Sequence, residues 1–186
     1  MTNDNDLLLL ASSQNNGTYK VYINSAGKKT LTPQTANYTA TYGNHYVCNH
    51  PSSSGLLYGK NPKKVICPNC SGAAGGFYKA FMGCTSLTSI SFPSLRTAIG
   101  GTLTNSYLSF YEAFYGCTSL TFASFPSLTS LESMFTGSEG SPFYLAFSHC
   151  SSSLKVHFKK SMKGTAGLNY STMGLTSAAQ VVFDLP

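Results

Sequence analysis

Hydrophobic positions recur at a fixed spacing in the second half of the chain. The segment FYKAFMGCTSLTSISFPSL begins at Phe77, returns at Phe110 as FYEAFYGCTSLTFASFPSL, and returns in weaker form at Phe143 as FYLAFSHCSSSLKVHF. In each copy, the apolar residues of FYxAFxxC are spaced for a short helical turn. The apolar positions of LTSISF then indicate a short strand, which the following proline ends. Self-similarity at this period predicts an array in which each unit buries its apolar side against its neighbours.

The part of the chain before Phe77 lacks this repeat. The segment TYKVYI at Thr18–Ile23 alternates polar and apolar positions and is followed by the turn-forming NSAGKK, so we expect a hairpin. The segment NYTATYGNHYVC at Asn37–Cys48 predicts another strand. A glycine-rich SGAAGG precedes Phe77 and is typical of a boundary. We therefore expect two regions, a β-rich docking region at 1–76 and a repeat region at 77–186.

The repeat units AFMGCTSLTSISFPSL and AFYGCTSLTFASFPSL resemble BspA-type leucine-rich repeats, which follow the pattern A-F-x-x-C-x-x-L-x-x-I-x-F/I-P. Units of that family have about 23 residues, so a spacing of 33 implies an insertion of about ten, filled by IGGTLTNSYLS in the first unit. The third copy has an extra residue in CSSSL and lacks the proline, as expected of a terminal unit that becomes a cap. The closing TSAAQVVFDLP predicts a final strand. Similar array ends occur in repeat proteins of gut bacteria and their phages.

Each repeat copy carries one cysteine, at Cys84, Cys117 and Cys150. Three equivalent positions cannot all pair among themselves, and a catalytic thiol needs a depressed pKa and a histidine base. Free cysteine behaves as a small buried hydrophobe. We therefore expect a column of packed thiols, with His149 as a variant of a surface turn.

The cysteines outside the repeat suggest a metal site. Cys67 and Cys70 form a CPNC knuckle, and Cys48 precedes them in VCNH with His50 as the fourth ligand, or His45 in its place. This pattern favours a Cys₃His zinc site like that of a zinc ribbon, with a structural role. A disulfide, free thiols or a redox pair are the alternatives.

Three tyrosines recur with the repeat, at Tyr78, Tyr111 and Tyr144. Packing between layers is one interpretation of this spacing. The other is an exposed ladder that contacts a sugar or a peptide.

Composition narrows the classes of function. Charged residues make up only 10% of the chain, and no acidic residue lies between residues 7 and 111. General acid–base catalysis and calcium binding both rely on placed carboxylates, so the sequence argues against a hydrolase or a calcium-dependent adhesin. The net charge is +6, but no arginine-rich run or nucleic-acid motif is present, so a nucleic-acid partner is not favoured. The start MTNDNDLLLLASSQ has neither the basic start of a signal peptide nor the length of a membrane span.

Together these observations predict a mainly β fold. We expect a short leucine-rich-repeat solenoid of about three 33-residue units with a C-terminal cap, preceded by a small β-rich, zinc-ribbon-like region. The sequence offers no catalytic constellation, and a solenoid presents an extended binding surface, so we expect a non-catalytic protein that attaches to a protein or glycan. The resemblance implies attachment at a cell surface and interaction with a host. Reduced or metal-bound cysteines favour synthesis in the cytoplasm. We therefore expect a phage virion component exposed after lysis, in contact with other virion proteins or further copies of itself. A bacterial cell-surface adhesin and an intracellular zinc-ribbon scaffold for nucleic acid are the alternatives.

Overall fold

The computed structural model describes residues 17–41, 46–48, 55–100, 109–132 and 140–186. Its strands, in chain order, are β1 (Thr18–Lys20), β2 (Tyr22–Ile23), β3 (Lys29–Thr30), β4 (Tyr38–Thr41), β5 (Lys64–Ile66), β6 (Cys70–Ala74), β7 (Ser89–Ser91), β8 (Thr97–Ile99), β9 (Phe122–Phe125), β10 (Ser130–Glu132), β11 (Lys155–Lys159) and β12 (Val181–Leu185). The helical elements among these residues are two short 3₁₀ helices, η2 (Lys160–Met162) and η3 (Ala178–Gln180).

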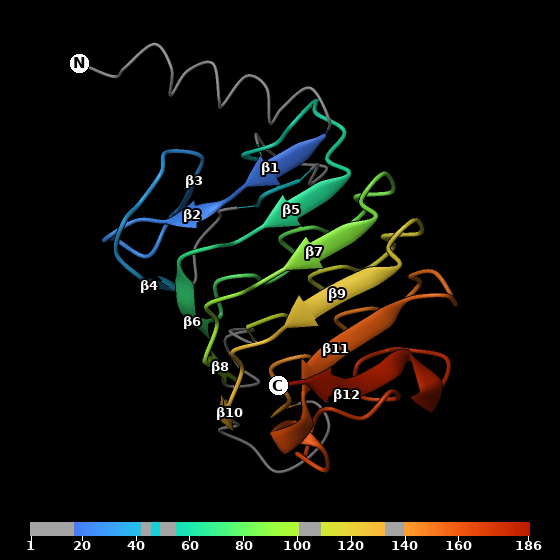
Figure 1. Cartoon of the computed structure of the whole chain (residues 1–186). Helices are drawn as coiled ribbons and strands as arrows, with labels where there is room; N and C mark the ends of the chain where they lie inside the picture. Colours follow the sequence, from blue (N-terminus) through green and yellow to red (C-terminus); the bar gives the residue numbers. More distant parts are fainter. Residues whose placement is uncertain (1–16, 42–45, 49–54, 101–108, 133–139) are drawn as a thin grey trace, which may run out of the picture.

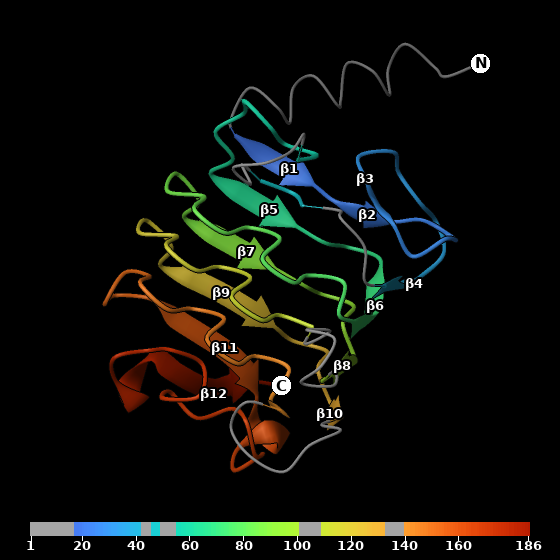
Figure 2. The ribbon, with the colours of Figure 1, turned by 180° about the vertical axis from the view of Figure 1, so that it is seen from behind.

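The strands form two parallel sheets and one small hairpin. The larger sheet has the order β1-β5-β7-β9-β11-β12, and the smaller has the order β10-β8-β6-β4. Figure 1 shows the strands of the larger sheet following one another from blue to red. The smaller strands lie along one side of that sheet, and the reverse view in Figure 2 shows the same arrangement. Most layers add one strand to each sheet, as in β5 with β6, β7 with β8, and β9 with β10.

A ladder of turns forms a third side of the stack, at residues 77–84, 110–117 and 143–150. The amide of Lys79 donates to the carbonyl of Tyr111 in the next layer at 2.9 Å, whereas the amide of Ala80 donates to Phe77 within its own layer. This alternation continues along the segment, so consecutive turns replace the helical turn that FYxAFxxC predicted. Lys79 has a φ of 50° in the left-handed region, and Glu112 (47°) and Leu145 (52°) share that conformation in the layers above.

Stacked phenylalanines fill the space between the three sides. They form three columns, each with one ring per layer: Phe77, Phe110 and Phe143; Phe81, Phe114 and Phe147; and Phe92, Phe125 and Phe158. Neighbouring rings in a column are stacked with centroids 4.8–5.3 Å apart. Rings of the third column meet those of the other two edge to face, as Phe92 does with Phe77 at 85°, whereas rings of the first two columns lie nearly parallel, as Phe77 and Phe81 do at 10°. Offset stacking and edge-to-face contact are the favourable aromatic geometries, so the repeat period places each ring where it packs best.

The predicted fold class is wrong. The described residues form six- and four-stranded parallel sheets with almost no helix, and these sheets run through both predicted regions instead of a mainly β solenoid behind a zinc-ribbon-like region. Strands β1 and β5 precede residue 77, yet they belong to the same sheet as β7 and β9. The sequence pattern does not reveal the N-terminal layers, because smaller residues such as Cys67 take the places that phenylalanine holds in later layers. Of the local predictions, the hairpin is confirmed in the antiparallel pair of β2 and β3.

The insertion predicted in the first repeat unit lies at the position that the sequence indicated. The hydroxyl group of Thr88 donates to Lys63 across a sequence separation of 25, whereas the equivalent bond from Thr121 to Thr88 spans a separation of 33. The eight additional residues fall between Ile99 and Phe110, because the equivalent Ala74 lies only three positions before Phe77. The insertion is thus two residues shorter than expected.

Candidate functional site

The three recurring tyrosines lie one above the other on the turn ladder. The rings of Tyr78 and Tyr111 are stacked, with centroids 5.4 Å apart and planes at 9°, and Tyr144 lies 5.9 Å further on at 39°. All three side chains are half-buried. Because each ring packs on the next, most of the flat ring surface is taken up by neighbouring tyrosines. The ring edges and hydroxyl groups lie at the rim of the column, where the side chain of Tyr111 hydrogen-bonds Glu112 and that of Tyr78 hydrogen-bonds Lys79.

An ion pair crosses this column between the first two layers. The Nζ of Lys79 lies 3.1 Å from Oε2 of Glu112, and it also lies over the rings of Tyr78 and Tyr111 at 5.4 and 5.8 Å. Burial alone would lower the pKa of Lys79, but the hydrogen bond and charge of Glu112 outweigh it and raise that pKa. Burial, followed by the hydrogen bond and charge of Glu112, raises the pKa of Tyr111 to about 12. Tyr111 therefore keeps its proton at neutral pH.

These residues form one surface, the tyrosine face, made of Tyr78, Lys79, Tyr111, Glu112 and Tyr144. The sequence predictions missed Lys79 and Glu112. A signal was available, because FYK and FYE place opposite charges at the same position of the first two copies. The pair is not continued in the third layer, where Leu145 takes the position.

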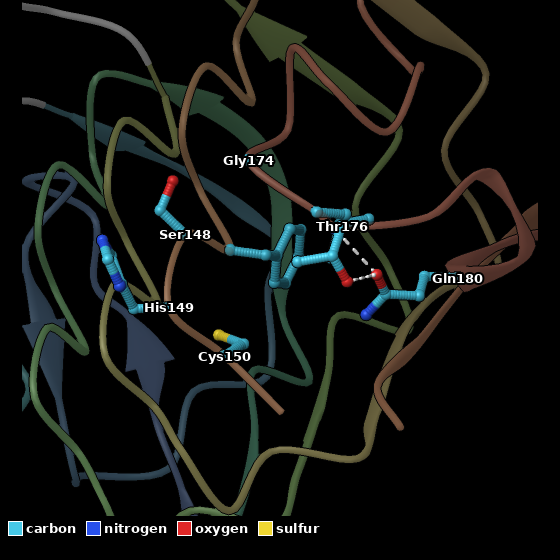
Figure 3. A pocket seen from close by; sticks show the side chains of 8 residues that line it. Ser148, His149, Cys150, Gly174, Thr176 and Gln180 are labelled. Atoms are coloured by element: carbon cyan, nitrogen blue, oxygen red, sulfur yellow. Dashed lines mark hydrogen bonds between the residues drawn. The ribbon is translucent and has the colours of Figure 1, made fainter. Parts of the chain in front are cut away.

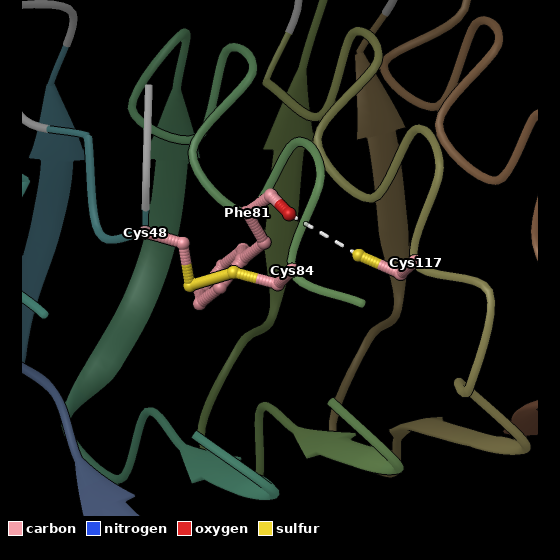
Figure 4. Close-up of a disulfide and its surroundings, with 4 residues drawn as sticks. All are labelled: Cys48, Phe81, Cys84 and Cys117. Carbon is pink, nitrogen blue, oxygen red and sulfur yellow. Dashed lines mark hydrogen bonds between the residues drawn. A yellow bond between two sulfur atoms is a disulfide. The ribbon is translucent and has the colours of Figure 1, made fainter. Parts of the chain in front are cut away.

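The cysteine column contains a disulfide. Cys84 is bonded to Cys48, from a layer below the repeats, and both residues are buried (Figure 4). Cys117 and Cys150 are free, and each thiol donates to a carbonyl one layer below, that of Phe81 or Phe114, at 3.1 Å. The prediction of packed thiols is therefore wrong for Cys84. The prediction considered pairing only among the three repeat cysteines, but the partner of Cys84 is Cys48, which lies outside the repeat.

The predicted zinc ligands are not brought together among the described residues. Cys48 is held in the disulfide and has no thiolate to offer, which corrects its assignment as a ligand. Cys67 and Cys70 are buried free thiols, and His50 lies outside the described residues. Within those residues, no group of three or more histidine, cysteine, aspartate or glutamate side chains is placed to hold a metal. A structural zinc ion held by these residues stays a prediction.

The CPNC motif is the turn of an earlier layer. Ile66 pairs with Ser91, and the amide of Cys67 donates to Ser91, just as the amide of Phe92 donates to Ser124 in the next layer. Cys67 thus takes the place of Phe92 in the repeat, and Cys70 takes the place of Leu95. Burial raises the pKa of the Cys67 thiol, and it raises that of Cys70 to about 12. Both cysteines are therefore protonated core residues at neutral pH.

A buried lysine lies beside this turn. Lys29 is only 8% exposed, and its Nζ lies 5.1 Å from the ring centroid of Phe77. Burial lowers its pKa to about 8, although the nearby Cys67 and Cys70 act in the opposite direction. The sequence did not predict this burial, because Lys29 stands in NSAGKK, a segment typical of an exposed turn.

A hollow of about 250 Å³ lies at the C-terminal end of the ladder (Figure 3). Its lining includes Phe147, His149, Cys150, Gly174, Thr176 and Gln180. His149 has a φ of 59°, at a position where the two layers below have Gly83 and Gly116. Its ring lies 4.8 Å from that of Tyr115.

Comparisons with protein-family models, with curated proteins and with solved structures found no match. Among the residues that the structure describes, no helix has the length and apolar character needed to cross a membrane.

Proposed function

We propose that this protein is a non-catalytic binding protein of a phage virion, in a tail, fibre or capsid decoration, and that it attaches to a protein or glycan on a host surface. The observation that carries the proposal is the tyrosine face. Three tyrosines at equivalent positions of successive layers place a row of hydroxyl groups in one polar network with Lys79 and Glu112, which hydrogen-bond Tyr78 and Tyr111.

The stacking of the rings defines the mode of binding. A sugar that packs on an aromatic side chain needs an open ring face, and here neighbouring tyrosines cover most of those faces. Recognition therefore proceeds through hydrogen bonds made with the hydroxyl groups, donated by Lys79 and accepted by Glu112. Hydroxyl-rich glycans and peptide backbones both offer matching donors and acceptors.

The disulfide supports display outside the cytoplasm. Disulfides persist in oxidising surroundings and are rare in the cytosol, so the Cys48–Cys84 bond revises the expectation of fully reduced or metal-bound cysteines. A virion released by lysis meets such surroundings. The same bond also favours a second candidate function, a bacterial cell-surface adhesin.

Binding to intact bacterial cells and to a glycan array tests the role of the tyrosine face. A triple variant with Tyr78→Phe, Tyr111→Phe and Tyr144→Phe keeps the ring stacking but removes three hydroxyl groups. We expect binding to weaken by about tenfold or more, since each lost hydrogen bond contributes about 0.5–1.5 kcal/mol. Tyr58→Phe is the matched control, because Tyr58 is 64% exposed and lies outside the face. Undiminished binding by the triple variant would rule out this face.

Antibody labelling separates the two locations. Labelling of purified phage particles supports the virion proposal, whereas labelling of intact uninfected cells supports the adhesin. Capsid, portal or tail genes beside the gene of this protein would point to the virion as well.

A further inference from the structure

Three cysteines, Cys84, Cys117 and Cys150, occupy the same corner of three successive layers, at the last position of the turn ladder. A fourth, Cys48, reaches this corner from the layer beneath, where its amide donates to the carbonyl of Ala80 as the amide of Phe81 donates to Ala113 one layer up. These four cysteines can form two disulfides, each between neighbouring layers, which would leave none of the four unpaired. The first pair is already formed between Cys48 and Cys84, whose Cα atoms are 6.2 Å apart (Figure 4).

We propose that Cys117 and Cys150 are the second pair, and that they form an interlayer disulfide when the folded protein meets a low-molecular-weight disulfide such as oxidised glutathione. This inference is independent of the proposed binding function. It would fasten together the two layers that carry Tyr111 and Tyr144.

The two layers are held in the register that the bond requires. On the N-terminal side of the pair, Phe114 donates to Ala146 and Gly116 donates to Ser148, both at 2.9 Å. The ring centroids of Phe114 and Phe147 are 4.9 Å apart, compared with 5.3 Å for Phe81 and Phe114 one layer below. Disulfides join Cα atoms that are roughly 4.4–6.8 Å apart, so neighbouring positions at this layer spacing are within bonding range.

The hollow at the end of the ladder gives the oxidant access to one of the two thiols. Cys150 is only partly buried and lines the hollow of about 250 Å³ (Figure 3), whereas Cys117 is completely buried. Cys150 therefore reacts first. Burial raises the pKa of Cys150 to about 12, so its thiolate is scarce and the reaction is slow near neutral pH.

The chemistry is two successive thiol–disulfide exchanges. The Cys150 thiol loses its proton to water, and its sulfur attacks one sulfur of oxidised glutathione. The glutathione S–S bond breaks, and one glutathione leaves as a thiolate that takes up a proton. Cys117 then loses its proton and attacks Sγ of Cys150, which releases the second glutathione. Overall, two protein thiols are oxidised to a disulfide while oxidised glutathione is reduced to two thiols.

The competing pair is Cys84 with Cys117. It requires the existing bond of Cys84 to Cys48 to break, and it leaves Cys48 and Cys150 without neighbours to pair with. Cys67 lies between β5 and β6 and Cys70 is the first residue of β6, so both lie outside the column and serve as internal controls.

Peptide mapping of the folded protein tests the proposal. The native chain is incubated with oxidised glutathione at mildly alkaline pH for an extended time, blocked with N-ethylmaleimide and digested with trypsin and a glutamate-specific protease. Cleavage after Glu112, Glu132, Glu139 and Lys155 places Cys117 on peptide 113–132 and Cys150 on peptide 140–155. We expect these two peptides to be linked. We also expect the melting temperature to rise by roughly 5–10 °C, as for a disulfide that closes a loop of this length.

Two variants complete the test. Cys150→Ser should abolish both the linked peptide and the rise in melting temperature, whereas Cys67→Ser should keep both. The proposal is overturned if both thiols carry N-ethylmaleimide after the incubation. A stable glutathione adduct on Cys150 beside an alkylated Cys117, or a link between Cys84 and Cys117, would overturn it equally.

Discussion

The turn at Cys67–Cys70 and the turn at Phe92–Leu95 occupy equivalent places in successive layers, but different forces hold them. Phe92 stacks on Phe125 with centroids 5.3 Å apart, and Ser94 needs one short hydrogen bond to the carbonyl of Pro68. The earlier turn has a small thiol in place of the ring. There the buried Asn69 side chain binds the amide and carbonyl of Ile23 and the carbonyl of Ala36, each at 2.8 Å.

The difference shows that one layer geometry can be maintained in two ways. Where a layer is stacked on equivalent layers on both sides, identical rings pack well and few polar side chains are needed. Where the layer borders the irregular β2–β3 hairpin, unpaired backbone groups must be satisfied, and a side-chain amide does so. The buried Lys29 belongs to this second kind of layer.

The largest expected difference in stability is between substitutions at the equivalent core positions Phe92 and Cys67. Phe92→Ala should lower the free energy of unfolding by about 3–5 kcal/mol, because it opens a large cavity among packed rings. Cys67→Ala should cost only about 1 kcal/mol, because it removes a single buried sulfur. Chemical denaturation followed by circular dichroism measures both. Equal costs would mean that the earlier turn is as tightly packed as the later one.

The next largest expected effect on the free energy of unfolding is that of Lys29→Met, which should stabilise the protein instead of destabilising it. Its pKa falls from 10.5 to about 8 on folding, so the folded state loses a proton between these values while the unfolded state retains it. The stability of the wild type should therefore rise over this pH range. Below pH 8, Lys29→Met should be the more stable protein by about 2–3 kcal/mol, after allowance for the lost contact with Phe77.

That advantage of Lys29→Met should disappear as the pH approaches 10.5. Thermal or denaturant unfolding at several pH values measures the gap, and the other titrating groups cancel because both proteins contain them. Lys28→Met is the matched control, since Lys28 is exposed and should change stability by less than about 0.5 kcal/mol. A gap that does not vary with pH would contradict the assignment of a buried amine.

The smallest of the three contrasts compares Asn69 with Ser94. Asn69→Ala should cost about 2 kcal/mol, because it leaves buried backbone groups of Ile23 without partners. Ser94→Ala should cost about 1 kcal/mol or less, because it removes one part-buried hydrogen bond. Equilibrium unfolding of both variants decides the matter, and a larger cost for Ser94→Ala would reverse the interpretation of the two turns.

The sequence predicted those parts of the fold that repeat. The phenylalanine positions, the repeat interval and the site of the insertion all follow from comparing one copy with the next. The sheet could not be extended below Phe77 in this way. Val21, whose amide donates to Ile66, and Cys67, whose amide donates to Ser91, hold the position of Phe92 in earlier layers, but both are smaller than phenylalanine. A clue was nevertheless present, since Pro68 stands after Cys67 as Pro93 stands after Phe92.

Contacts between dissimilar segments could not be predicted. The bond of Cys48 to Cys84 joins an irregular N-terminal segment to a repeat, and no local pattern identifies such a partner. The pairing of cysteines cannot be deduced from their spacing alone. The tyrosines were found because they recur, whereas Lys79 and Glu112 were missed because their positions recur with different residues.

The turn ladder also gives the stack an electrical direction. Its interlayer hydrogen bonds all point the same way, since each layer donates N–H groups to the carbonyls of the next layer toward the C-terminus, ending with Leu145 to Thr172 and Phe147 to Met173. Aligned peptide dipoles add, as they do in a helix, whereas in a β-sheet they largely cancel. The positive end of the ladder therefore lies at the C-terminal layers. Two copies packed side by side along their ladders would be favoured with their stacks running in opposite directions.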